Sequence, residues 1–109
     1  MPQETLLVYC TCPDTSSAEQ LAHYLVSNQL AACINIVPSV QSIYQWQGRV
    51  HYDYESQLQI KTSSEHYQVL AQHIKAQHPY ELPEIIAVPI SQGQPDYLAW
   101  IHDCLVKKS

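Results

Sequence analysis

The segment from Val50 to Ile60 alternates apolar and polar residues almost without interruption, with the apolar residues at even positions. Successive side chains of a strand point to opposite faces, so this pattern predicts a β-strand with one packed face. Extended to Arg49 and Thr62, the strand would be roughly 46 Å long at about 3.3 Å per residue. A compact domain of 109 residues is only roughly 34 Å across. The strand should therefore project beyond its own domain, where another copy of the chain would cover its tyrosine and valine side chains.

The composition is that of a well-packed globular protein, with 46% hydrophobic and 14% charged residues, and we expect residues 1–109 to form a single domain. No apolar run approaches the ~20 residues of a membrane span, and the N-terminal residues carry no secretory signal. The net charge is −5, and the five basic residues do not form the patch on which nucleic-acid binding depends. We therefore expect a cytoplasmic protein that binds neither membranes nor nucleic acids.

Apolar runs, helical spacings and turn residues predict the order strand, helix, strand, strand, helix, strand, helix. The expected strands are residues 6–10, 32–46, 49–62 and 84–90, and the expected helices run from 15 to about 28, from 63–65 to 78, and from 93–96 onward. Pro38 cannot donate to a strand ladder, which predicts a bulge or a sheet edge there. With right-handed crossovers this order is an α+β, ferredoxin-like βαββαβ sandwich with an extra C-terminal helix and a four-stranded antiparallel sheet.

The clearest candidates for metal chemistry are cysteine and histidine side chains. Cys10 and Cys12 lie on the same face at the end of the first strand, where soft sulfur ligands suit copper(I) or zinc. Cysteine also packs as a small apolar residue, so a purely structural role stays open. His78 lies where a helix ends, either as a cap or as a ligand. No CxxC pair is present, which excludes a zinc ribbon, and His66 and His73 are expected to be exposed to solvent.

The sequence offers little for catalysis. It contains no GxSxG or P-loop motif and only two glycines, so it lacks a Gly-rich phosphate-binding loop. Cys10 and His78 could form a thiolate–imidazolium pair, but no neighbouring residue favours activation of the thiol. We therefore expect a protein without enzymatic activity.

Tyrosine and tryptophan dominate the aromatic residues, and both are enriched in protein interfaces. The candidates for an interface between subunits on the projecting hairpin are Tyr44, Trp46, Tyr52 and Tyr54. Glu55 and Lys61 share one face of the long strand. They could orient a ligand in a cleft between subunits, or they could simply be solvated or form an ion pair between subunits.

Several separate segments resemble the CutA divalent-cation tolerance family. They are residues 30–38 (LAACINIVP), 42–48 (SIYQWQG), 78–85 (HPYELPEI) and 97–101 (YLAWI), and the similarity runs over nearly the whole chain. The resemblance implies a cytoplasmic homotrimer with interlocking hairpins, similar in architecture to PII signalling proteins. It also implies a role in tolerance of divalent metals, copper especially.

The resemblance also implies particular site residues. Metal ligands of the family fall on Cys10 and His78, with copper or another divalent ion as a non-obligatory cofactor. Some members carry a second histidine where this chain has Gln77, for which Cys12 is a conceivable substitute, and Ser39 stands where the family often has glycine. An alternative is a PII-like signalling or scaffold trimer that binds a small ligand or a partner protein between subunits. The residues proposed for that cleft are Glu55, Lys61, Tyr80, Glu84 and Trp100.

Overall fold

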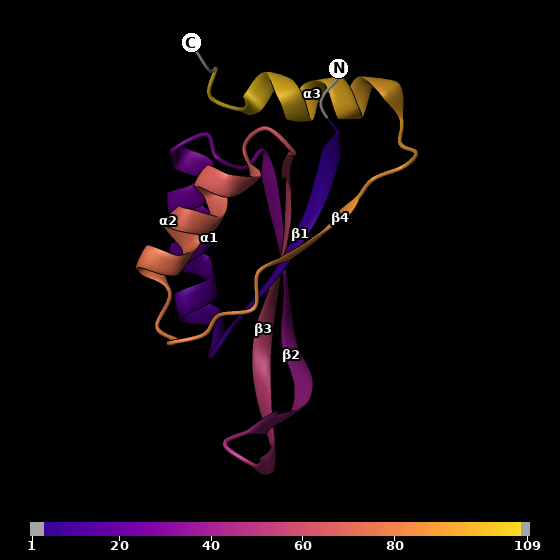
Figure 1. Cartoon of the computed structure of the whole chain (residues 1–109). Coiled ribbons are helices and arrows are strands. Elements are labelled where there is room, and N and C mark those ends of the chain that lie inside the picture. The colour runs from indigo at the N-terminus through magenta and orange to yellow at the C-terminus, as the bar shows by residue number, and fades with distance from the viewer. Residues whose placement is uncertain (1–3, 108–109) are drawn as a thin grey trace.

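The computed structural model describes residues 4–107 and contains one sheet, two helices on one face of it and a third helix across one end (Figure 1). The elements are β1 (Thr5–Cys12), α1 (Thr15–Ser27), β2 (Cys33–Trp46), β3 (Arg49–Ser63), α2 (Tyr67–Gln77), β4 (Ile86–Pro89) and α3 (Pro95–Cys104). The strand order is β2-β3-β1-β4, and every neighbouring pair is antiparallel. The predicted α+β, ferredoxin-like arrangement with a C-terminal helix is confirmed.

The first strand and helix form where local sequence signals place them. Strand β1 is apolar because it lies between β3 and β4 and has a helix layer over one face. The Asp14 side chain caps α1 by accepting a hydrogen bond from the Ser17 amide at 2.8 Å. The helix ends with Gln29 in the left-handed region, at φ 59°, and the Leu30 amide donates to the Leu25 carbonyl. This Schellman ending turns the chain toward β2.

The hairpin of β2 and β3 confirms the prediction made from the alternating sequence. Its turn residues Gln47 and Gly48 both have positive φ, 51° and 78°, as a type I′ turn requires. The strand register shifts between Val37 and Val40, where Ser39 adopts φ 59°. The bulge expected at Pro38 is therefore present, in a strand that also lies at the edge of the sheet.

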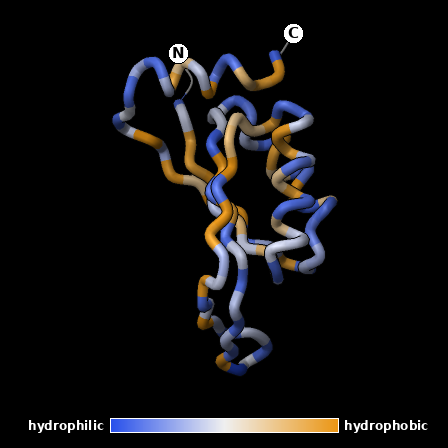
Figure 2. The backbone as a smooth tube through the Cα atoms, turned by 180° about the vertical axis from the view of Figure 1, so that it is seen from behind, coloured by the Kyte–Doolittle hydropathy of each residue, from blue (hydrophilic) through white to orange (hydrophobic). Residues whose placement is uncertain are grey.

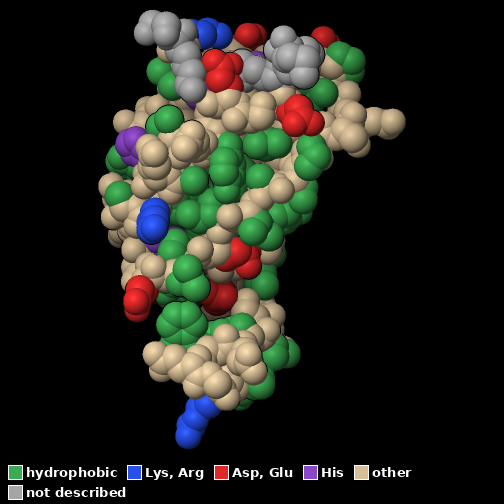
Figure 3. Space-filling model, viewed as in Figure 1, with side chains coloured by type: hydrophobic (Ala, Val, Ile, Leu, Met, Phe, Trp, Pro, Cys, Tyr) green, Lys and Arg blue, Asp and Glu red, His purple; other side chains and the backbone are tan. Residues whose placement is uncertain are grey.

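The hairpin projects well beyond the helices (Figure 1), and the chain measures 43 × 26 × 23 Å. Its apolar side chains are largely open to solvent in the single chain, with exposed fractions of 70% for Ile43 and 75% for Val50. Figure 2 shows hydrophobic positions continuing along the strands to the tip, and Figure 3 shows hydrophobic side chains both over the body and on the projection.

The core lies between the sheet and the helix pair α1 and α2. Even-numbered residues of β1, and of β3 from Ser56 onward, face these helices and are buried, as Val8 and Ile60 show. The helices contribute Leu25, Leu70 and Ile74, each fully buried. The opposite face of the sheet carries no helix and presents partly exposed residues of β3 at 57, 59 and 61. At the end of the sheet away from the hairpin tip, α3 buries Ile101.

Three sequence predictions were wrong in detail. Strand β4 is limited to Ile86–Pro89 rather than 84–90, because the regular register with β1 covers only these residues. Helix α2 begins at Tyr67, since Ser63 still belongs to β3. His66 is buried rather than exposed, because its Nδ1 contacts the Ser63 hydroxyl at 2.6 Å and its Nε2 contacts the Val106 carbonyl at 2.6 Å.

Candidate metal centre

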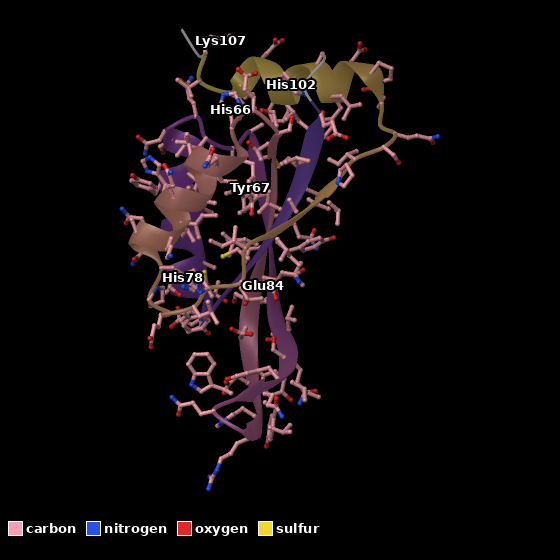
Figure 4. The ribbon with its side chains drawn as sticks, in the orientation of Figure 1. His66, Tyr67, His78, Glu84, His102 and Lys107 are labelled. Atoms are coloured by element: carbon pink, nitrogen blue, oxygen red, sulfur yellow. The ribbon has the colours of Figure 1, made fainter. Side chains whose placement is uncertain are left out.

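Three donor side chains converge where the end of β1 meets the end of α2. The sulfur atoms of Cys10 and Cys12 and an imidazole nitrogen of His78 all lie within 4.8 Å of one another. Both cysteines are fully buried, and His78 is 8% exposed. Figure 4 labels His78 at the end of α2, with sulfur atoms drawn beside it. The sequence prediction paired Cys10 with His78 and named Cys12 as a conceivable substitute ligand, and the structure places all three together.

The chain direction at His78 explains why its ring faces β1. The residue has extended geometry, φ −76° and ψ 140°, because the following Pro79 disfavours the helical conformation. Its Nδ1 accepts a hydrogen bond from the Tyr80 amide at 3.0 Å. An amide only donates, so the ring proton is on Nε2, which donates to the Thr11 carbonyl at 2.7 Å. The Cys12 sulfur lies 3.8 Å from the same Nε2.

The two thiols differ in acidity. The pKa of Cys12 is lowered because the Cys10 thiol donates a hydrogen bond to its sulfur. The same hydrogen bond, together with burial, raises the pKa of Cys10. Cys12 is therefore the first of the pair to become a thiolate, which is the form that binds metals.

A small cavity of about 90 Å³ opens beside the cluster. Its lining residues are Cys12, Ser17, Gln20, Leu21, Gln77 and Pro79. Drug-sized ligands occupy cavities of about 300–1,000 Å³, so this one suits an ion or a few water molecules. It lies between α1 and the end of α2, next to Cys12.

Next to the cluster, a tyrosine–carboxylate pair ties the 78–85 loop to β3. The Tyr80 hydroxyl donates to Glu55 Oε2 at 2.6 Å, and Glu55 is only 8% exposed. Burial and the Glu55 carboxylate raise the pKa of Tyr80 well above its ordinary value. Sequence reasoning had placed both residues in a cleft, but had no signal that they bond to each other.

The chain matches known proteins over nearly its whole length. Residues 6–104 match the family model described as CutA1 divalent ion tolerance protein. The chain belongs to the CutA1 family. The divalent-cation tolerance protein CutA of Pectobacterium atrosepticum is 39% identical over 102 residues, covering 94% of this chain and 93% of that protein.

Solved CutA1 structures share the fold as well as the sequence. The Oryza sativa CutA1 structure superposes with a TM-score of 0.93 at 40% identity, covering 96% of each chain. The Thermus thermophilus divalent cation tolerance protein superposes with a TM-score of 0.91 at 42% identity, covering 94% of this chain and 99% of that one. A relative from Archaeoglobus fulgidus, with a TM-score of 0.89 at 35% identity over 92% of this chain and 97% of that one, is named a periplasmic CutA. Within residues 4–107 of the chain, no helix is long and apolar enough to cross a bilayer.

The remaining cleft candidates of this CutA1 chain are Lys61, Trp100 and Glu84. The Lys61 ammonium donates to the Cys33 sulfur at 3.7 Å and to the Asn35 side chain. Trp100 is 44% exposed on α3, where it stacks on Tyr97 with ring centroids 5.5 Å apart. Glu84 is exposed.

The hairpin candidates of this CutA1 chain are all exposed. The exposed fractions are 39% for Tyr44, 40% for Trp46, 67% for Tyr52 and 64% for Tyr54. Tyr44 additionally donates to the Asp53 carboxylate across the hairpin. Large aromatic side chains are thus concentrated on the projection.

Proposed function

We propose that this CutA1 chain binds copper or another transition-metal ion at the cluster of Cys10, Cys12 and His78. The supporting observation is the approach of two sulfur atoms and an imidazole nitrogen to within 4.8 Å in a buried position. Soft thiolate and imidazole donors suit copper and zinc, whereas calcium and magnesium prefer oxygen ligands. A bound ion could not react elsewhere in the cell, and in this way such a site would contribute to metal tolerance.

The chain's own residues prepare the cluster for an ion. The bond from Cys10 favours the Cys12 thiolate, and the helices α1 and α2 exclude bulk water from both sulfur atoms. The cavity lined by Gln20 and Gln77 lies next to Cys12 and has room for an ion.

Copper and zinc titrations of reduced protein test this function. Cys10→Ala and Cys12→Ala should each weaken binding, while Cys104→Ala, a partly buried free thiol on α3, serves as the matched control. Binding that is equally strong in all three variants would refute the site.

We further propose that the protein is a homotrimer in the cytoplasm. The exposed apolar hairpin and the sheet face without helices support assembly, since monomers rarely expose contiguous apolar patches this extended. Four free cysteines suit a reducing compartment. Sedimentation and native mass measurement should give three chains, and cell fractionation should recover the protein in the cytoplasm. A folded single chain at micromolar concentration would contradict the assembly.

A second candidate function is a PII-like trimer that binds a small ligand or partner protein between subunits. The buried Glu55 carboxylate with its Tyr80 partner favours it, because a buried charged group next to the projecting hairpin would face any cleft formed there. A thermal-shift screen of metabolites with metals chelated distinguishes the two functions. Stabilisation by an organic compound would favour this one.

We propose no enzymatic activity for this fold. The thiol of Cys10 is fully buried and its pKa is raised, both of which oppose nucleophilic attack. Iodoacetamide should not label it faster than an ordinary thiol at neutral pH.

A further inference from the structure

We propose that Cys33 and Lys61 form a redox-sensitive crosslink. Hydrogen peroxide oxidises the Cys33 thiol, and the Lys61 amine then attacks the oxidised sulfur. The product is a sulfenamide, with a covalent bond between Cys33 Sγ and Lys61 Nζ. This modification site shares no residue with the cluster of Cys10, Cys12 and His78, so it does not depend on the proposed metal binding.

The register of the sheet carries the first step of the argument. Cys33 of β2 and Lys61 of β3 are directly opposite each other in the antiparallel pair. Side chains of opposite residues on neighbouring strands share one face of the sheet and lie close together. The Lys61 ammonium donates a hydrogen bond to Cys33 Sγ at 3.7 Å. The two atoms that would bond are therefore already in contact in the folded chain.

The second contact of Lys61 carries the next step. Its ammonium also donates to the side-chain oxygen of Asn35, two residues along β2 from Cys33. Within residues 4–107 the acceptors of this ammonium are thus an amide oxygen and a sulfur atom, and neither is a carboxylate. The four-carbon stem of lysine is flexible, so Nζ can close the remaining distance to the sulfur. Asn35 is a positioning residue that holds the amine next to Cys33.

The surroundings of the thiols carry the third step. The Cys33 side chain is partly buried, whereas those of Cys10 and Cys12 are fully buried. Cys33 also begins the edge strand β2, at the end of the sheet away from the hairpin tip. Reactive cysteines lie in partly exposed, positively charged surroundings, and buried structural cysteines are inert. Of these three thiols, only Cys33 combines exposure with a cation in contact.

The chemistry balances with the peroxide as the only oxidant. The Cys33 sulfur attacks one oxygen of hydrogen peroxide and the O–O bond breaks, which gives a sulfenic acid and one water molecule. The sulfur loses two electrons, and these reduce the peroxide. Lys61 releases a proton to solvent, and its neutral amine attacks the sulfenic sulfur. The S–N bond forms, the S–O bond breaks, and hydroxide leaves with a proton of the amine as a second water molecule.

The crosslink changes the face of the sheet that carries no helix. It joins β2 to β3 covalently and removes the positive charge of Lys61, because a sulfenamide nitrogen is not protonated at neutral pH. A thiol reductant breaks the S–N bond and restores both side chains. The pair would therefore respond reversibly to peroxide.

The first test treats the metal-free full chain with hydrogen peroxide. Peptide mapping should show the Cys33 peptide joined to the Lys61 peptide, with a mass lower by two hydrogen atoms, and a thiol reductant should separate them. Cys104 is the internal control. It is also a partly buried free thiol, but the hydrogen bond from Lys61 to Cys33 is the only one between an amine and a thiol among residues 4–107.

The second test uses dimedone, which traps sulfenic acids. Lys61→Arg keeps a cation beside the sulfur but replaces the amine with a guanidinium, which is a poor nucleophile. Dimedone should label Cys33 at least about threefold more in this variant than in the unsubstituted chain, because no amine competes for the oxidised sulfur. Lys75→Arg, at an exposed position of α2, is the matched control and should change neither the labelling nor the crosslink.

Either of two results would overturn the inference. One is equal dimedone labelling of Cys33 in the unsubstituted chain and in the Lys61→Arg variant. The other is the absence of the linked peptide from the unsubstituted chain after peroxide treatment, a readout that does not require any variant to fold.

Discussion

His78 Nε2 donates to the Thr11 carbonyl at 2.7 Å, which joins the end of α2 to the last residues of β1. His78→Ala should lower the free energy of unfolding by about 1–3 kcal/mol, because it leaves a buried carbonyl without its donor. His78→Gln should recover much of the loss. Urea denaturation measures both, with His23→Ala, an exposed histidine on α1, as control. Equal stability of the His78→Ala and His23→Ala variants would show that the bond is unimportant for folding.

Two non-glycine residues in the left-handed region should be sites of stabilisation. Gln29 and Ser39 both have φ 59°, a conformation disfavoured for L-residues by about 1–2 kcal/mol. Gln29→Gly and Ser39→Gly should each raise the free energy of unfolding by about 0.5–1 kcal/mol after the entropic cost of glycine. Ser42→Gly, in regular strand, should instead lower it. The opposite ranking in thermal melts would mean that the entropic cost of glycine outweighs the backbone strain that it relieves.

The hairpin tip should matter more for assembly than its exposure in one chain suggests. If neighbouring subunits bury Trp46, Trp46→Ala should cost about 3–5 kcal/mol and shift the protein toward smaller species in light scattering. Val26→Ala is the control, because Val26 on α1 is 39% exposed and Trp46 is 40% exposed. An assembly of unchanged size and melting temperature would place Trp46 outside the interface.

Alkaline pH should destabilise the protein through Tyr80. Burial and Glu55 raise the pKa of Tyr80 in the folded state, whereas an unfolded tyrosine has a pKa of about 10. Above pH 10 the unfolded chain loses this proton while the folded chain keeps it, so stability falls as pH rises. Tyr80→Phe should lack this contribution, and its stability curve between pH 8 and 11 should be flatter. Parallel curves for the two proteins would contradict the raised pKa.

Gln77 lies in the cavity next to Cys12, where a histidine would add an imidazole donor. Gln77→His should therefore raise zinc affinity by about tenfold or more, because zinc gains one of the four ligands it prefers. Gln72→His, on an exposed position of α2, is the matched control. A similar gain in both variants would indicate nonspecific binding by surface histidines.

The elements set by neighbouring residues could be predicted from the sequence. The period of the long strand, the Gln47–Gly48 turn and the bulge near Pro38 each depend on residues adjacent in the chain. The burial of His66 could not be predicted from the sequence. Its partner Val106 lies forty positions away and becomes its neighbour only through packing of the C-terminal segment. The predicted ends of β4 were wrong for the same reason, since pairing with β1 sets where this strand begins and ends.

At the candidate site, too, features set by adjacent residues could be predicted from the sequence, and features set by tertiary packing could not. The common face of Cys10 and Cys12 follows from strand geometry, and the position of His78 next to a proline was visible in the sequence. Which ring nitrogen of His78 carries the proton was not visible, because the backbone of Thr11 and Tyr80 decides it. The bond between Tyr80 and Glu55 likewise needed the path of the loop.

The open hairpin has a consequence for how the protein matures. If the chain assembles as proposed, its exposed valine, isoleucine and aromatic side chains should make each newly made chain prone to aggregation until it binds other copies. The yield of refolded protein should thus peak at an intermediate concentration. In dilute samples the chains meet too rarely to assemble, and in concentrated samples they aggregate nonspecifically.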